Sequence, residues 1–515
     1  MSFKIEQKVK GTIYVYEAVS YWDKEKKQSR QKKKLIGKRD PKTNKIIPTG
    51  KNPQKVKIKD YGCTDFLEKI YRKIGLLDEV KSVFKDTYSE IMTIISFMLT
   101  ENKPVYLAAD WLEANYSSFS NINISSQRLS ELFKNIGKTP DKKFSFFRNW
   151  IHRNKPNDIV FYDITSISSY SEKLDIAEWG YNRDKEKLKQ INMGLIYGRN
   201  SNIPLSYNFN QGSISDVSTL KKTMEFNNEL GLKEVMYIMD RGFYSQKNLD
   251  NISDEKLIIP VPYSTKLAKN IVEENKNELS SDNNMISYND HLYYYLSKEK
   301  TINNKDYKIH VFRDKVKYEI RETEFYKEIL NIEKRLNSVS FSSKDDLEEE
   351  LRTMAKSKSK FFQIKSNDNN FYIERKPEDI IKAKQRFGTV VYLTNSSKLF
   401  KEDVIRLQKN RDYIEKVFNS MKNELSQNRL RVNSSDRVDG KLFVIFLALI
   451  VNSYIEKIRK NSKTLKNKTK KEIFYELKKI KSVIYSNSFK QITELSKRAK
   501  DIYDSFEFKY PENNS

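Results

Sequence analysis

The chain has 515 residues, of which 96 are Lys or Arg and 69 are Asp or Glu, so its formal net charge is +27. A chain of this length exceeds one compact core, so we expect about two to four domains, and 38% hydrophobic residues exclude a disordered protein. Positive charge spread along the chain favours a polyanionic partner, most often nucleic acid. Part of the excess has a compositional source, because Lys, Asn and Ile are frequent throughout, as coding in AT-rich DNA would produce.

The scarcity of cysteine and histidine limits the kinds of site. The one cysteine, Cys63, excludes an internal disulfide and a cysteine-cluster zinc site and is typical of a reducing compartment. With three histidines, a histidine-rich metal site is not expected, so any metal must be held by oxygen. The N-terminus lacks a secretory signal pattern, and the apolar stretches at 91–99 and 442–451 are shorter than the roughly 20 residues of a membrane span. We expect a soluble, intracellular protein.

The first 60 residues are predicted to be β-rich, because TIYVYEAVSYW is dense in β-branched and aromatic residues. The segment KKLIGKRDPKTNKIIP is predicted to form a hairpin that turns at residues 40–44. The basic run over residues 24–34 is either a solvated hairpin face or one that contacts phosphates.

Helical periodicity follows over residues 62–153. The segments FLEKIYRKIGLL, EIMTIISFMLT and SSQRLSELFKNIG are predicted to be amphipathic helices. Ser125 is the expected N-cap of the last one, Gly137 its stop, and His152 a packing or capping residue at a helix end. These helices fit a helix-turn-helix-like DNA reader or an ordinary packed bundle.

Strands that alternate with helices predict an α/β core from about residue 157 onward. In the strand NDIVFYDITSI the apolar run ends at Asp163, and INMGLIYGRNSNIPLSYNF is strand-like as well. After a helix over residues 218–230, the strand EVMYIMD ends at Asp240, and KLIIPVP follows a helix that begins near Ser245. Both aspartates are therefore expected at strand C-termini, where open sheets place their ligands.

Residues 264–385 break this rhythm with charged, irregular sequence and are predicted to be an insertion. Within it we expect two strands, HLYYYL and YKIHVFRD, with His310 in a structural role, and then helices over residues 324–336 and 345–356. The alternation of strands and helices resumes at the predicted strand TVVYLTN. A long helix over about residues 402–426, a hydrophobic helix and a lysine-rich helical tail complete the prediction.

Two aspartates on neighbouring strands and a glutamate on a later helix form a combination suited to two Mg²⁺ ions. Hard cations prefer carboxylate oxygens, and paired ions activate a water or a 3′-hydroxyl and stabilise the leaving oxygen. Taken singly, Asp163 or Asp240 is more often a turn or helix cap, and Glu415 is more often a solvated residue. The combination is what indicates a metal site.

Three segments carry a family resemblance. YDITS contains Asp163, MDRGFYS contains Asp240, and RDYIEKVFNSMK contains Glu415 with Arg411 four residues before it and Lys422 seven after it. Together they resemble the signature regions of DDE transposases of the insertion-sequence-four type. The β-rich start resembles the long-chain sub-branch, and NRLRVNSSDRVDGKLFVIFLALIV looks like the family's continuation after the third region.

The resemblance implies a fold class and an activity. The fold is an α/β RNase H-like core, a mixed β-sheet flanked by helices and interrupted by an insertion domain, with a β-rich then helical N-terminal region and a helical C-terminus. The activity is binding to the inverted repeats of transposon ends, DNA strand cleavage with two Mg²⁺ or Mn²⁺ ions held by Asp163, Asp240 and Glu415, and attack of the freed 3′-OH on target DNA. The expected partners are double-stranded DNA, at transposon ends and target, and a second copy of the chain, in a homodimer on paired ends in the bacterial cytoplasm at the nucleoid.

The expected domains are a β-rich region (1–60), a helical DNA-binding domain (61–155), the first part of the core (156–263), the insertion domain (264–385), the second part of the core (386–455) and a basic helical region (456–515).

The resemblance also implies residues that contact DNA. Arg411 and Lys422 lie on roughly one helix face with Glu415 and are expected to grip phosphates; the alternative for Arg411 is an ordinary i, i+4 ion pair on a solvated helix. Arg241 is a further expected DNA contact. Trp179 either stacks on a base or anchors the core or a loop. The family's tyrosine position before Arg411 is occupied by Gln408, a departure from the pattern.

Two other functions fit parts of the sequence. One is a metal-dependent DNA nuclease that cuts without joining, because the same fold and metals serve both outcomes. The other is a non-catalytic DNA-binding derivative, against which the presence of all three carboxylates argues.

Overall fold

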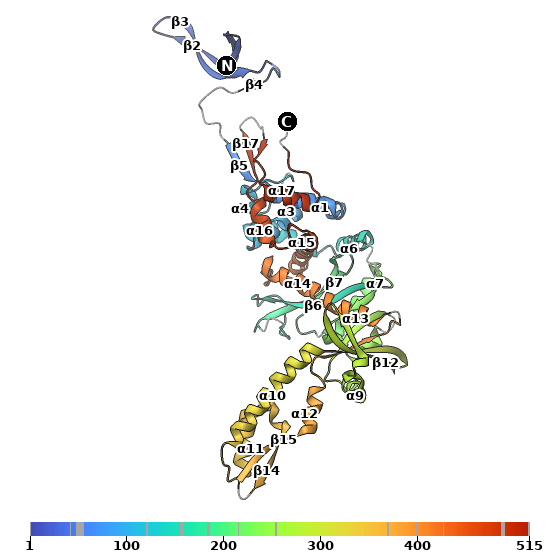
Figure 1. Ribbon diagram of the computed structural model, residues 1–515. Coiled ribbons are helices and arrows are strands. Elements are labelled where there is room, and N and C mark those ends of the chain that lie inside the picture. The colour runs from blue at the N-terminus through green and yellow to red at the C-terminus, as the bar shows by residue number, and fades with distance from the viewer. Residues whose placement is uncertain are drawn as a thin grey trace. The chain divides into compact units, whose positions relative to one another are not determined.

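The computed structural model describes residues 2–41, 43–47, 56–119, 122–154, 159–182, 186–214, 216–252, 255–367, 370–397, 399–425, 427–485 and 490–512. The described chain divides into two compact units, which are Met1–Lys59, Lys481–Thr493 and Glu512–Ser515, and Asp60–Ile480 and Glu494–Pro511 (Figure 1). The finer domain boundaries expected from the sequence stay a prediction.

The smaller unit is built of strands. Its described strands are β1 (Ser2–Val9), β2 (Thr12–Asp23), β3 (Gln28–Arg39), β4 (Ile46–Ile47), β5 (Val56–Asp60), β17 (Lys481–Tyr485) and β18 (Lys490–Ile492). The first four pair antiparallel in chain order, and the predicted hairpin is confirmed where β3 pairs with β4, although residue 42 of its turn lies outside the described residues. The first seven residues of β3 are exposed, which suits both alternatives for the basic run.

The C-terminal region is not wholly helical, contrary to expectation. β17 lies between β18 and β5, so residues near both ends of the chain share a sheet. Val483, Ile484 and Tyr485 are β-branched or aromatic and favour a strand. The helices of this region are α16 (Lys470–Leu477) and α17 (Lys497–Ser505).

The larger unit begins with helices. They are α1 (Gly62–Lys73), α2 (Leu76–Val83), α3 (Tyr88–Thr100), the short η1 (Val105–Leu107), α4 (Ala108–Ala114), α5 (Ser126–Gly137) and α6 (Pro140–Asn154). The three predicted helices are confirmed, except that the first is divided at Gly75, whose φ of +74° suits glycine. Ser125 caps α5 as predicted, since its side chain accepts from the backbone N–H of Arg128 at 3.3 Å. His152 is exposed on α6 and does not pack.

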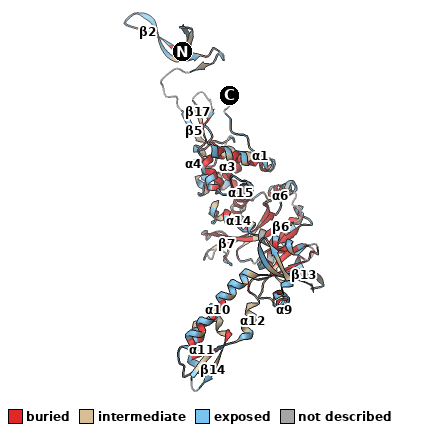
Figure 2. Cartoon of the chain, in the orientation of Figure 1, coloured by how far each residue is buried: buried red, intermediate tan, exposed pale blue. Residues whose placement is uncertain are grey.

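Helix α15 (Ser435–Asn461) packs closely along α5. A Cβ on Gly440 would lie 1.8 Å from the carbonyl oxygen of Phe133, so only glycine permits this approach. Among the described residues, α15 is the helix long and apolar enough to cross a membrane, with a mean hydropathy of 1.8 in its most apolar window. Of that window, 89% is buried inside the protein, as expected for a core helix (Figure 2).

A large mixed sheet lies at the centre of this unit. Its described strands, in spatial order, are β11 (Met285–Tyr288), β12 (His291–Ile302), β13 (Lys305–Asp314), β16 (Thr389–Thr394), β10 (Lys256–Val261), β9 (Met236–Ile238), β6 (Ile159–Ser169), β7 (Lys189–Gly198) and β8 (Ile203–Gln211). β6, β7 and β8 are antiparallel neighbours, whereas β9 runs parallel to both β6 and β10. The expectation of a mixed α/β sheet with helices is confirmed.

Helices and short turns connect these strands. They are α7 (Asp216–Glu229), η2 (Arg241–Phe243), α8 (Gln246–Asn251), α9 (Lys266–Glu274), η3 (Glu278–Ser280), η4 (Asp282–Asn284), α13 (Lys401–Asn410), α14 (Asp412–Asn419) and the π-helical turn η6 (Ser420–Glu424). The predicted long helix over about residues 402–426 is thus present as three consecutive pieces.

The predicted insertion, residues 264–385, has two parts. Strands β11, β12 and β13 extend the large sheet, and His310 lies buried in β13, where it meets the hydroxyl of Tyr295 at 3.0 Å. Burial, helped by the charge of Lys308, lowers the pKa of His310 to about 4. The second part has its own cluster of buried apolar side chains. It comprises α10 (Lys315–Asn337), α11 (Lys344–Ala355), η5 (Lys356–Phe361), β14 (Phe362–Asn367), β15 (Asn370–Arg375) and α12 (Pro377–Lys384).

Candidate active site

Asp163 and Asp240 lie at the same level of two neighbouring parallel strands. Phe161 of β6 pairs with Ile238 of β9, and each aspartate stands two residues further along its chain. Side chains alternate along extended backbone, and Asp240 is still extended at φ −79° and ψ 161°, so both carboxylates point to one face of the sheet. The prediction that Asp163 ends its strand is wrong, because β6 continues to Ser169 in pairing with β7. Asp240 does follow the end of β9.

Glu415 lies on α14, which packs against β6, the strand that carries Asp163. The connection runs through Arg411, at the junction of α13 and α14. Its Nη1 donates to Oδ1 of Asp240 at 2.5 Å, and its Nη2 donates to Oε1 of Glu415 at 2.7 Å. One guanidinium therefore bridges two of the three predicted carboxylates, and the i, i+4 pair with Glu415 is half of a larger contact.

The electrostatics agree with this geometry. Burial lowers the pKa of Arg411, but the hydrogen bond to Glu415 and the negative charges of Asp240 and Asp163 outweigh it, so the pKa is raised. The side chain of Arg411 is 27% exposed, against 36% for Asp240 and 51% for Glu415. The site is a negatively charged cluster, open to solvent on the Glu415 side, with one internal cation.

The donor set suits a hard divalent cation, because every candidate ligand is a carboxylate oxygen. Within the described part of the chain, no three His, Cys, Asp or Glu side chains are close enough together to hold a metal ion. The guanidinium of Arg411 lies between Asp240 and Glu415 and bonds to both. Asp240 and Glu415 can bind a metal ion only if the guanidinium of Arg411 releases both carboxylates.

Lys422 lies in η6, beyond Glu415, and its charge acts on a carboxylate that the sequence did not single out. Burial opposes ionisation of Glu186, but hydrogen bonds from Arg429 and Ser168, with the charges of Arg429 and Lys422, lower the pKa of Glu186. The bonds are 2.6 Å from Arg429 and 2.7 Å from Ser168. No sequence signal distinguishes Glu186 from other loop glutamates, because its partners are distant in the chain.

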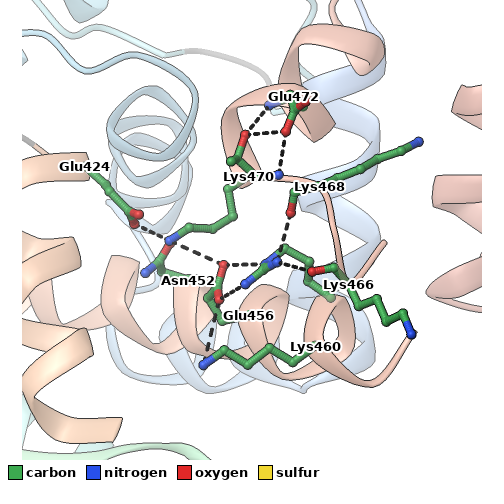
Figure 3. Close-up of polar contacts among 10 residues, drawn as sticks. Glu424, Asn452, Glu456, Lys460, Lys466, Lys468, Lys470 and Glu472 are labelled. Atoms are coloured by element: carbon green, nitrogen blue, oxygen red, sulfur yellow. Dashed lines mark hydrogen bonds and ion pairs between the residues drawn. The ribbon is translucent and has the colours of Figure 1, made fainter. Parts of the chain in front are cut away.

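The far end of the helix that carries Glu415 is fixed by a buried lysine, Lys470 (Figure 3). Its Nζ donates to Glu424 of η6 and to Oδ1 of Asn452 in α15, the latter at 2.6 Å. Nearby, Arg459 donates to both carboxylate oxygens of Glu456 at 2.9 Å. The network joins η6, α15 and the start of α16, so Glu415 stands on a well-supported helix.

Arg241 and Trp179 are both exposed. Arg241 begins η2 directly after Asp240 and lines a cavity of about 350 Å³ together with Asp240, Tyr392 and Arg411. Trp179, 61% exposed, lies in the loop between β6 and β7, so a core role for it is wrong. Base stacking by Trp179 stays a prediction. The side chain of Gln408 lies outside the described residues.

Residues 154–451 match the family described as transposase DDE domain. Because the match spans more than half of the chain, this protein belongs to that transposase family. No curated protein matches the chain. Among solved structures, it is similar to a cryo-EM structure of the piggyBac transposase synaptic complex with hairpin DNA, at a TM-score of 0.34 and 11% identity over 80% of this chain and 70% of that one.

Proposed function

We propose that this transposase binds the inverted repeats at transposon ends, cleaves the DNA strands there with two metal ions, and joins the freed 3′-OH to target DNA. The observation that carries the proposal is the placement of the three carboxylates: Asp163 and Asp240 share one level of the sheet, and Arg411 ties Glu415 to Asp240. The strand order supports an RNase H-like core, since three antiparallel strands (β6 to β8) are followed by two strands parallel to the first.

The chain's own residues have distinct roles in this proposal. Asp163, Asp240 and Glu415 hold the cations, and bound Mg²⁺ or Mn²⁺ would activate a water or 3′-hydroxyl and stabilise the leaving oxygen. When DNA is bound, Arg411 and Lys422 grip phosphates on the same side of the sheet. Arg241, exposed beside Asp240, adds a further phosphate contact.

The remaining parts of the proposal concern assembly and origin. We assign the chain to the long-chain sub-branch of the insertion-sequence-four type on the motifs around Asp163, Asp240 and Glu415. It acts as a homodimer, because two transposon ends must be cut together, in the bacterial cytoplasm at the nucleoid. Trp179 stacks on an exposed base of the bound end.

The test replaces each carboxylate by its neutral isostere. Asp163→Asn, Asp240→Asn and Glu415→Gln should each lower cleavage of a plasmid that carries the DNA flanking the gene by at least about 100-fold, because each removes a ligand of the cations. Binding to the same DNA, measured by gel shift, should change less than about threefold, since phosphate contacts supply most of the affinity. The matched control is Glu402→Gln, an exposed carboxylate at the start of α13.

Two results would contradict the proposal. Cleavage within about tenfold of the wild type in any of the three variants removes that residue from the site. Cut ends that are never joined to an unrelated target plasmid identify a nuclease without strand transfer.

A further inference from the structure

A second cavity, of about 460 Å³, lies apart from the carboxylates. Its walls come from η1, the start of α5, the end of β6 and α15. The segment that follows Leu430, whose backbone N–H donates to the carbonyl oxygen of Ser168 in β6, forms the rest of the wall. Ser169 at its edge is six residues from Asp163 along β6, which is about 20 Å of extended strand. The cavity is therefore a separate site on the same unit, within the size range of small-molecule pockets.

The charge of this cavity is positive. Arg431, Arg437 and Lys441 line it, and none of the described lining residues is acidic. Lys441 is 4% exposed, and its Nζ donates to the carbonyl oxygen of Leu430 at 2.6 Å. Arg437 bonds to neutral groups, at 2.7 Å to Ser130 Oγ. Neither Lys441 nor Arg437 forms an ion pair with a carboxylate that the structure describes.

A buried ammonium without a counter-ion is costly, and proteins rarely keep one where nothing needs it. Burial, with the charge of Arg431, lowers the pKa of Lys441 to about 7. An anion entering the cavity supplies the missing negative charge and favours the protonated lysine. Arg431 stands beside it with a left-handed backbone, φ +49°, a conformation that is uncommon outside glycine.

Aromatic rings form the rest of the opening. Tyr106 and Tyr170 are 61% and 71% exposed, and Phe133 is buried in the wall behind them. The guanidinium of Arg429 lies 5.1 Å from the centroid of the Tyr170 ring. The ring of Tyr106 and the face of Tyr170 opposite Arg429 are the flat surfaces on which a heterocycle stacks. An inorganic anion would leave these surfaces unused.

We propose that this cavity binds a nucleotide, with the base against Tyr106 and Tyr170 and the phosphate at Arg431, Arg437 and Lys441. The nucleotide is either an unpaired one in a DNA strand or a free nucleoside phosphate; only the first source rests on the proposed function. The site is distinct from the carboxylates and needs no metal ion.

Binding is measured by fluorescence anisotropy with labelled decathymidylate and by calorimetry with thymidine 5′-monophosphate and with inorganic phosphate, all in EDTA. Tyr170→Ala and Arg431→Ala should each weaken decathymidylate binding at least about fivefold, as loss of one stacked base or one phosphate contact predicts. The controls are Tyr181→Ala, which removes an exposed tyrosine of the same loop, and Lys187→Ala, which removes an exposed cation; each should stay within about twofold.

The outcomes separate the two sources. If thymidine monophosphate shows the same dependence on Tyr170 and Arg431, the ligand is a free nucleotide; if only the oligonucleotide does, the ligand is a nucleotide within a strand. Wild-type decathymidylate binding in Tyr170→Ala and Arg431→Ala overturns the proposal, as does inorganic phosphate that binds as tightly as the nucleotide. All of these binding measurements are made in EDTA and need no cleavage, so failure of the cleavage test leaves their result unaffected.

Discussion

Arg411 and Lys441 are both largely shielded cations, but their surroundings are opposite. Arg411 bonds to two carboxylates, and its pKa is raised; Lys441 bonds to one backbone carbonyl, and its pKa falls to about 7. Where a cation is already neutralised by the protein, a new cation must compete with it. Where the protein does not neutralise the cation, binding of an anion is favourable. The two places therefore favour ligands of opposite charge.

This contrast indicates that Arg411 competes with a metal ion for its two carboxylates. Its guanidinium bonds to both Asp240 and Glu415, and a phosphate would offer it another anionic partner. Transfer of the guanidinium to a phosphate would leave both carboxylates to a metal ion.

Removal of divalent cations should abolish DNA cleavage. An all-oxygen carboxylate site holds Mg²⁺ or Mn²⁺ and lacks the His and Cys ligands typical of zinc. After dialysis against EDTA, cleavage measured on gels should be undetectable and should return with either ion. Undiminished cleavage in EDTA would show that the carboxylates serve another purpose. Binding of decathymidylate in EDTA serves as the control for intact protein.

Arg411→Ala should lower cleavage at least about tenfold, because it would remove the phosphate contact that the proposed function assigns to Arg411. The same change should tighten Mn²⁺ binding in the absence of DNA about fivefold, measured by electron paramagnetic resonance, since the competing cation is gone. Thermal stability should change little, because Asp240 and Glu415 remain partly solvated.

Arg406→Ala is the matched control, since Arg406 also pairs with an acidic residue of its own helix, Asp403. It should leave cleavage and Mn²⁺ affinity unchanged. Lys422→Ala should lower cleavage to a similar degree as Arg411→Ala without tightening Mn²⁺ binding. If Arg411→Ala binds Mn²⁺ like the wild type, the guanidinium does not compete with the metal.

The sequence predicted the secondary-structure elements and contacts that depend on residues close together in the chain. Periodicity placed nearly all core strands and helices, and spacing offered the i, i+4 pair of Arg411 with Glu415 as the alternative to a phosphate contact. It did not predict the bond from Arg411 to Asp240, because the partners are 171 residues apart and meet only through the packing of α14 on the sheet. For the same reason it missed the pairing of β17 with β5 and the extension of the sheet by β11 to β13. Lys441 looked like one residue of a hydrophobic helix, since nothing local reveals a cavity.

The smallest effect is expected from Lys441→Met, and its sign depends on pH. Because burial holds the pKa of Lys441 near 7 in the folded protein, against 10.5 ordinarily, the unfolded chain binds more protons between these values. The penalty for this lysine is thus complete below pH 7 and shrinks as the pH rises toward 10.5. The variant removes the penalty, so its Tm should exceed that of the wild type by at least about 2 °C at pH 6 and by clearly less at pH 9. Lys463→Met, at an exposed lysine beyond the end of α15, should show a difference that does not vary with pH. A Tm difference for Lys441→Met that is equal at pH 6 and pH 9 would mean that the ammonium is already neutralised, and the contrast with Arg411 would then disappear.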